Sequence, residues 1–368
     1  MIRYAFPACL LPLPALADVP NVMTDIAPIH SLTAQVMGDL GTPDLLLLPG
    51  ADPHDFALRP SDAAALDDAD LVIWVGEALT PWLEAPLETL ATSATKLSLL
   101  ETEGWNVLEF RDLEMIGSAD DPGHDDHDDH DDHDDHDDHD HDEHAHDADK
   151  DEHDNADDDH DAQEHDDHDE HDQGKEEDHD DHDHGDDHDH GHDHDHGAFD
   201  PHGWADPAVA EVWVANIAEA LSAVDPDNAA TYQANAAATA AQLDALDAQI
   251  SGQLSAVAGN SYILPHDGYQ YFEVRYGLNA AGALATGNAE TPGPAQVAAL
   301  REEMTEEDIV CVFSDTSIPE RWASVVVEGS DAKTAELDIV GLDLEAGPDL
   351  YNDMMIRLGD SFASCLSD

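Results

Sequence analysis

Basic residues are scarce in this chain of 368 residues. Lysine and arginine together number 11, against 87 aspartates and glutamates, so the formal net charge is −76. A charge of this size repels nucleic acids and anionic membrane surfaces, and we expect neither as a partner. It is compatible with cationic ligands or with a saline environment.

Long apolar runs are also missing, because no segment reaches the roughly 20 residues that a membrane-spanning helix requires. The N-terminal run, MIRYAFPACLLPLPALAD, is shorter and carries a single basic residue, Arg3. It ends in the small residues Ala15 and Ala17. This pattern predicts a cleaved signal peptide over residues 1–17 and an exported mature chain.

Cysteine is rare, and removal of that leader leaves Cys311 and Cys365. An even number in an oxidising compartment suggests one disulfide bond, with two buried free thiols as the alternative. The bond would tie the C-terminal helix to a core strand. Cys9 precedes most of the leader's apolar run, a position that argues against lipidation there.

The acidic residues concentrate in one segment. Between Ser118 and Gly197 there are 41 acidic residues and 22 of the 26 histidines. Almost nothing apolar interrupts this tract, so it is expected to be disordered. A flexible chain loses conformational entropy when it wraps an ion, so repeats such as HDDHDDHDDHDD should bind several ions weakly. A solvated spacer is the alternative.

Outside the tract, strand-like and helix-like segments alternate, which predicts parallel strands joined by helical crossovers. Strands are expected at Asn21–Asp25, Asp44–Leu48, Leu71–Val75, Ser261–Leu264, Ile309–Phe313 and Leu337–Val340. Helices are expected at Pro28–Leu40, Pro60–Asp68 with Ser61 as its cap, Pro207–Val224, Asp227–Val257, Pro319–Gly329 and Pro348–Cys365.

This order predicts an α/β protein of two similar αβ lobes bridged by a long helix. The N-terminal lobe would span residues 18–225, with the His/Asp-rich insertion at 118–197. Residues 226–257 would form the linking helix, because their apolar residues recur every three or four positions. Residues 258–368 would form the C-terminal lobe.

Four histidines lie outside the tract: His30, His54, His202 and His266. The last three sit in loops next to expected strands or helices, where open α/β folds bind ligands. Three imidazoles suit Zn²⁺ and leave one position for a carboxylate or water. Solvated or capping histidines are the alternative, since the chain has no H-E-x-x-H or C-x-x-C motif. His30 is expected as an exposed helix-start residue or near the cleft mouth.

Several stretches together resemble one known family. They are PGADPHDFALRPSDAAALDDADLVIWVG, DPHGWADP, HDGYQYFEVRYGL, CVFSDTSIPE and the terminal ASCLSD. The chain is similar over nearly its whole mature length to the periplasmic zinc-binding proteins of high-affinity zinc ABC transporters, the cluster A-I metal solute-binding family. That family has two αβ lobes, a bridging helix and an acidic histidine-rich insertion at this point.

The resemblance implies that His54, His202 and His266 hold the metal. Manganese-binding relatives tend to have a carboxylate where His266 stands, so histidine favours zinc, as imidazole softness also does. Some relatives take a fourth ligand from an L-D-P motif. Here Asp338 lies between Leu337 and Ile339, a departure at the proline that leaves Asp338 or water.

The resemblance also implies the Cys311–Cys365 disulfide and a non-enzymatic role. The chain would capture Zn²⁺ in the periplasm as a monomer and dock transiently with an inner-membrane ABC permease, with an auxiliary zinc chaperone as a further partner. The tract would be a weak collector or sensor of zinc. The alternatives are a periplasmic metal buffer and a His₃-zinc hydrolase. Tyr269, Tyr271 and Phe272 are expected to pack around the site.

Overall fold

The computed structural model describes residues 19–48, 51, 53, 54, 56–111, 199–285, 293–304 and 308–367. These residues fall within one of the two units into which the chain divides, Met1–Asp120 together with His194–Asp368. The expected signal peptide over residues 1–17 and the insertion over 118–197 lie outside the described residues.

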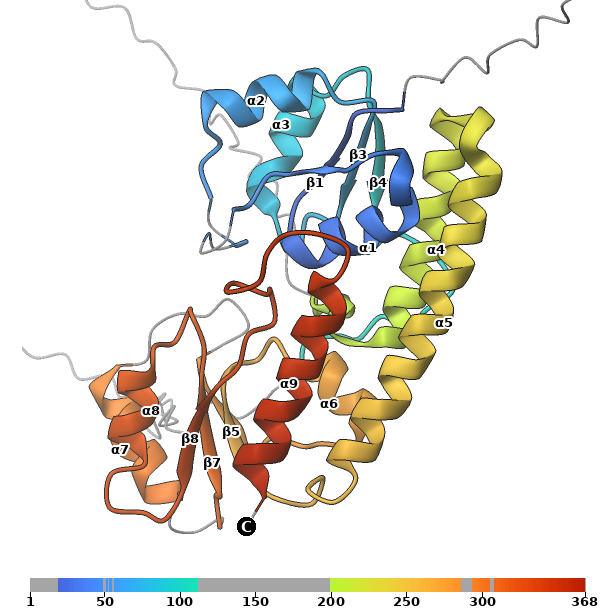
Figure 1. Cartoon of the computed structure of the whole chain (residues 1–368). Helices are drawn as coiled ribbons and strands as arrows, with labels where there is room; N and C mark the ends of the chain where they lie inside the picture. Colours follow the sequence, from blue (N-terminus) through green and yellow to red (C-terminus); the bar gives the residue numbers. More distant parts are fainter. Residues whose placement is uncertain are drawn as a thin grey trace, which may run out of the picture. The chain divides into compact units, whose positions relative to one another are not determined.

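The first sheet has four parallel strands in the order β2-β1-β3-β4. The strands are β1 (Val22–Thr24), β2 (Asp44–Leu45), β3 (Leu71–Trp74) and β4 (Thr95–Ser98), and α1 (Ala27–Met37), α2 (Pro60–Asp67) and α3 (Glu84–Thr89) accompany them. Figure 1 shows α2 and α3 beside this sheet. Every residue of β1 and β3 is buried, as near-continuous apolar strands of a covered parallel sheet should be.

The second sheet repeats this topology in the order β6-β5-β7-β8, again with every pairing parallel. Its strands are β5 (Tyr262–His266), β6 (Gly282–Ala285), β7 (Cys311–Ser314) and β8 (Lys333–Glu336), with α6 (Gln270–Tyr276), α7 (Pro294–Glu303) and α8 (Glu320–Val326). The matching strand orders confirm the prediction of two similar αβ lobes.

Three longer helices complete the described structure: α4 (Pro207–Val224), α5 (Ala229–Leu254) and α9 (Leu350–Leu366). Helix α5 runs alongside α4 and also contacts α1 and α9 (Figure 1). Its buried side chains include Leu243, Leu246, Ile250 and Leu254, the predicted stripe. Helix α5 occupies most of the segment 226–257, whose limits as a linking domain stay a prediction.

Helix α4 has the predicted limits because its ends are strongly marked. The Asp206 side chain accepts a hydrogen bond from the N–H of Ala208 at 2.8 Å, and Pro207 occupies the first helical position. By length and composition alone α4 is the one described helix that could cross a membrane, which the sequence analysis did not anticipate. Trp213, Ile217 and Leu221 are nevertheless fully buried, so α4 packs as a core helix.

Other expectations were wrong in detail. The run Leu337–Val340 is not a strand, since β8 lies just before it at Lys333–Glu336. Helix α6 occupies part of HDGYQYF, which the sequence did not predict as helical. The residue at the N-cap of α2 is Arg59 rather than Ser61, and its backbone N–H donates to the carboxylate of Asp62 at 3.0 Å.

Two covalent or backbone links join distant parts of the sequence. Cys311 of β7 and Cys365 of α9 form the predicted disulfide, with Cα atoms 5.8 Å apart. Glu109 and Phe199 form an isolated antiparallel bridge, and the N–H of Asp200 donates to the carbonyl of Leu108 at 2.9 Å. The two ends of the described chain that flank the insertion therefore meet.

Candidate metal centre

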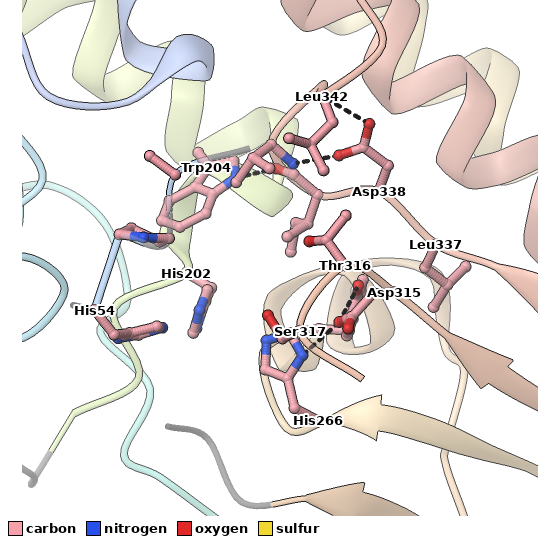
Figure 2. Close-up of a pocket in the computed structure, with 15 residues that line it drawn as sticks. His54, His202, Trp204, His266, Asp315, Thr316, Ser317, Leu337, Asp338 and Leu342 are labelled. Atoms are coloured by element: carbon pink, nitrogen blue, oxygen red, sulfur yellow. Dashed lines mark hydrogen bonds and ion pairs between the residues drawn. The ribbon is translucent and has the colours of Figure 1, made fainter. Parts of the chain in front are cut away.

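One pocket brings together the three histidines that the sequence singled out. Its lining includes His54, His202, Trp204, His266, Tyr269, Asp315 and Asp338. Figure 2 shows His54, His202 and His266 arranged around the same space. His202 and His266 are buried, with 2% and 5% of their surface exposed, whereas His54 is half-buried.

Strand ends and helix starts position these side chains. His54 lies in the loop between β2 and α2, and His202 immediately precedes the 3₁₀ turn Gly203–Ala205 that leads into α4. His266 is the last residue of β5. Because β5, β7 and β8 are parallel, their carboxyl ends lie at one edge, where Asp315 and Asp338 also follow their strands.

The three imidazole rings are close neighbours. The ring centroids of His54 and His202 are 5.7 Å apart, and those of His202 and His266 are 5.8 Å apart. As the side chains stand, no three His, Cys, Asp or Glu residues of the described chain are close enough to count as a coordination set. The rings thus surround one space without converging fully on one point.

Carboxylates hold two of these rings. Oδ1 of Asp200 lies 2.8 Å from Nδ1 of His202, and Oδ2 of Asp315 lies 2.6 Å from Nδ1 of His266. An ionised carboxylate can only accept, so each Nδ1 carries a proton, and in the neutral imidazole each Nε2 then keeps a free lone pair. Such a lone pair is what a metal ligand requires.

Gly268 lies against both of these Nε2 atoms. A β-carbon built at this position would be 2.3 Å from Nε2 of His266 and 3.1 Å from Nε2 of His202. The first distance is shorter than any real contact to a β-carbon. Glycine therefore leaves room for the rings, and both Nε2 atoms face the same small volume.

His54 is held in its neutral form. Burial, together with the nearby His202 and His266, lowers the pKa of His54 to about 3. A neutral imidazole is the form that binds a metal, so His54 is ready to coordinate throughout the physiological pH range. The indole N–H of Trp82 donates to the carbonyl of Pro53 at 2.8 Å. This hydrogen bond holds the residue that immediately precedes His54.

Asp338 lines the pocket but also anchors its own loop. Its Oδ1 accepts the N–H groups of Val340 and Gly341 at 3.0 and 2.7 Å, and its Oδ2 accepts that of Leu342 at 2.7 Å. Trp204 links this loop to the histidines. Its indole N–H donates to the carbonyl of Ile339 at 2.7 Å, and its ring lies 5.2 Å from that of His202.

His30 and two of the three aromatic residues lie elsewhere. His30 is buried, at 4% exposed, and its Nε2 is 3.0 Å from the carbonyl of Pro43, so the expected exposed position was wrong, and His30 is not among the residues that line the pocket. Tyr269 does line the pocket, with its ring 5.4 Å from that of His266. Tyr271 instead accepts a hydrogen bond from the N–H of Leu108, and Phe272 stacks on Phe362.

Sequence reasoning missed the residues that support the histidines. Asp200 could have been found from the D-x-H spacing in FDPHGW, which lets the carboxylate turn back to the ring. Asp315 is 49 residues from His266 and had no spacing signal. Only the pairing of β5 with β7 brings these two residues together. The contact of Trp82 with Pro53, 29 residues away, likewise had no spacing signal.

Similar proteins agree over almost the whole chain. Residues 22–365 match the model of the family described as ZnuA, zinc-uptake complex component A periplasmic. The high-affinity zinc uptake system protein ZnuA of Paracoccus denitrificans is 38% identical over 355 residues, 96% of this chain and 94% of that protein. The protein of the same name from Brucella suis biovar 1 is 33% identical over 347 residues, 94% of this chain and 92% of that protein.

Solved structures share the fold. A crystal structure of ZnuA has a TM-score of 0.65 at 17% identity and covers 95% of this chain and 100% of its own. A ZnuA deletion mutant with zinc bound has a TM-score of 0.64 at 18% identity, with coverage of 95% and 99%. The family match and the relatives above 30% identity show that this chain belongs to the ZnuA family of periplasmic zinc-uptake components.

Proposed function

We propose that this chain captures Zn²⁺ in the pocket lined by His54, His202 and His266 and delivers it to an ABC permease for import. The gathering of these three imidazoles around one pocket carries the proposal. The names of its relatives, high-affinity zinc uptake system proteins, support the same substrate.

The ring separations fit zinc with a small adjustment. Imidazoles bound at about 2.0–2.1 Å around a tetrahedral zinc ion would have ring centroids about 5.2 Å apart. The separations of 5.7 and 5.8 Å are slightly larger. Rotation of the rings, or a small closure of the pocket, would bring the nitrogens into coordination distance. Three imidazoles also favour zinc over manganese, which prefers oxygen ligands.

The fourth coordination position falls to Asp338 or to water. Asp338 already accepts three backbone hydrogen bonds. A carboxylate has about four acceptor positions, so one is left for a metal. Binding the ion would use this last position and compete with the hydrogen bonds that hold the loop, so we favour water as the fourth ligand, although Asp338 lies in the lining of the pocket.

The hydrogen bonds of the carboxylates in this pocket favour metal capture over catalysis. Asp315 is engaged by the His266 ring and by the N–H of Ile318 at 2.7 Å, and Asp338 by its own loop. A zinc hydrolase needs a base that is free to take a proton from the metal-bound water. The described lining offers these two carboxylates in structural hydrogen bonds instead.

The family supports a proposal for the wider setting. We propose a monomer that works in the periplasm after cleavage of residues 1–17 and that docks transiently with the inner-membrane permease. An auxiliary zinc chaperone and a collecting role for the 118–197 tract remain predictions, as does the alternative of a metal buffer centred on that tract.

A zinc titration against a competing chelator tests the proposal. The mature chain should show one tight site besides weak ones. Substitution of His54, His202 or His266 by alanine should weaken the tight site by more than about 100-fold, since loss of a ligand exceeds the 10- to 100-fold typical of an outer partner. His30→Gln is the matched control, because His30 is a buried histidine away from the pocket.

Deletion of residues 120–197 separates capture from buffering. The tight site should survive this deletion, while the weak sites decrease in number. If tight binding is lost with the tract and persists in the three alanine variants, the proposed pocket is wrong and the buffer alternative is correct.

A further inference from the structure

Two carboxylates outside the expected ligand set contact the histidine rings. Asp200 precedes α4, and Asp315 follows β7, so the two come from different parts of the sequence. They are 0% and 6% exposed, respectively. Each faces the Nδ1 atom of one ring, which leaves Nε2 directed at the pocket.

Further hydrogen bonds fix both carboxylates. Oδ1 of Asp200 also accepts the backbone N–H of His202 at 2.9 Å, and the backbone of Asp200 is itself held by Leu108. Asp315 accepts the N–H of Ile318 at 2.7 Å and the hydroxyl of Tyr269 at 3.3 Å. Because several hydrogen bonds hold each carboxylate, the ring that it contacts has little freedom to rotate or to change its tautomer.

The site also needs negative charge. Three neutral imidazoles around a dication would leave two positive charges in a largely buried pocket, and buried charge is costly unless it is compensated. Asp267 is buried beside His266, but Arg111 pairs with it at 2.7 Å and also with Glu273. Asp338 is held by three backbone amides.

Asp200 and Asp315 are therefore the carboxylates best placed to offset the ion. Their charges act through the rings, since a carboxylate on Nδ1–H makes the opposite nitrogen a stronger ligand. Two carboxylates and three imidazoles around Zn²⁺ give a neutral group without any carboxylate bound directly to the metal.

We infer that Asp200 and Asp315 are positioning residues of the zinc site, which fix the tautomer of His202 and His266 and supply the negative charge that balances the ion. This inference rests on the proposed zinc capture and adds the source of its affinity. Each lobe then contributes one preassembled His–Asp pair, so the site does not depend on a carboxylate as a direct ligand.

Paired substitutions separate the hydrogen bond from the charge. Asp200→Asn and Asp315→Asn keep one oxygen that can accept from Nδ1–H but remove the charge, and in Asp315→Asn the N–H of Ile318 then loses its acceptor. Zinc affinity should fall by about 10- to 100-fold in each, with the tautomer unchanged. The leucine variants at the same positions lose both the hydrogen bond and the charge. The zinc affinity should therefore fall at least as far, and the contacted histidine should become a mixture of its two tautomers.

Chelator competition measures the affinity, and ring ¹⁵N chemical shifts of the metal-free protein report which nitrogen carries the proton. Asp225→Asn is the matched control, since Asp225 is a buried carboxylate that accepts from Tyr232 and Asn228 away from the pocket. It should leave both the zinc affinity and the His202 and His266 shifts unchanged.

The outcomes are distinct. If the unsubstituted chain binds zinc tightly and the asparagine variants bind equally well, the charge role is wrong and zinc capture stands. If the leucine variants keep the original tautomer, the positioning role is wrong. If a leucine variant does not fold, the asparagine pair still decides the charge role. Absence of a tight site in the unsubstituted chain would overturn both proposals.

Discussion

The indole N–H of Trp82 donates a 2.8 Å hydrogen bond to the carbonyl oxygen of Pro53. Trp82 lies in a 3₁₀ turn (Pro81–Leu83) after β3, and its ring also packs against Phe56, 5.1 Å between centroids. The loop that carries His54 is therefore attached to the rest of its lobe on both sides of that histidine.

Replacing Trp82 by phenylalanine should weaken zinc binding modestly. The ring contact with Phe56 is kept, and one hydrogen bond next to His54 is lost. A hydrogen bond contributes about 0.5–1.5 kcal/mol, so we expect an affinity loss of roughly 2- to 10-fold in chelator competition. Trp105→Phe removes an indole hydrogen bond to Thr102 away from the metal pocket and should leave the affinity unchanged. Equal losses in the two variants would contradict a specific role for Trp82.

Asp338→Asn should reduce stability more clearly than zinc affinity. An asparagine cannot accept from Val340, Gly341 and Leu342 as the carboxylate does, so one buried N–H loses its partner. The expected cost is about 1–3 kcal/mol in the free energy of unfolding, measured with denaturant in metal-free buffer. Its zinc affinity should fall far less than in the His266→Ala variant. A loss as large as that variant's would instead identify Asp338 as the fourth ligand.

Loss of the disulfide between Cys311 and Cys365 should destabilise the metal-free protein. The bond closes a loop with a sequence separation of 54, for which the chain-entropy model gives about 4 kcal/mol. Denaturant unfolding of the oxidised chain, the reduced chain and the Cys311→Ala/Cys365→Ala variant measures this difference. The reduced chain and the variant should agree closely. An oxidised chain no more stable than either one would contradict the prediction.

Asp25 should make stability depend on pH. It is fully buried after β1, and its carboxylate accepts the N–H groups of Ile26 and Val75, each at 2.8 Å. Burial outweighs these bonds and raises the pKa of Asp25 from 3.8 to about 7. The folded state therefore binds a proton that the unfolded state releases between these values, so the contribution of Asp25 to stability decreases as pH rises from about 4 through 7.

The Asp25→Asn variant isolates this effect, because asparagine does not titrate. The free energy of unfolding of the unsubstituted chain, relative to the variant, should fall with pH by at most about 1.4 kcal/mol per unit. Denaturant unfolding across this range in metal-free buffer measures it. Parallel pH curves for the two proteins would show that Asp25 does not titrate there.

Strong local signals explain which elements the sequence predicted. Asp206 and Pro207 start α4, and Asp225 followed by proline stops it, so its limits were predicted correctly. β8 was missed because Lys333–Glu336 is partly exposed and lacks an apolar run. Leu337 and Ile339 are apolar because they pack as a buried loop, and their pattern was mistaken for a strand.

In the candidate site too, residues with a local sequence signal were predicted and residues that depend on long-range contacts were not. His54, His202 and His266 could be singled out because each was expected in a loop next to a strand or helix, and the family resemblance supplied their role; His266 is in fact the last residue of β5. The contact of His266 with Asp315 depends on strand pairing over 49 residues, which no local pattern reveals. Gly268 could not be recognised either, since its importance is the space it leaves beside two ring nitrogens.

Because Glu109 and Phe199 form a bridge, the length of the segment between them has little effect on the stability of the folded protein. A loop whose ends already meet costs only about 0.6 kcal/mol more for each doubling of its length. Insertions and deletions between these two residues can therefore accumulate with little effect on the folded lobes. Selection on the length of that segment is thus largely free of the requirements of folding.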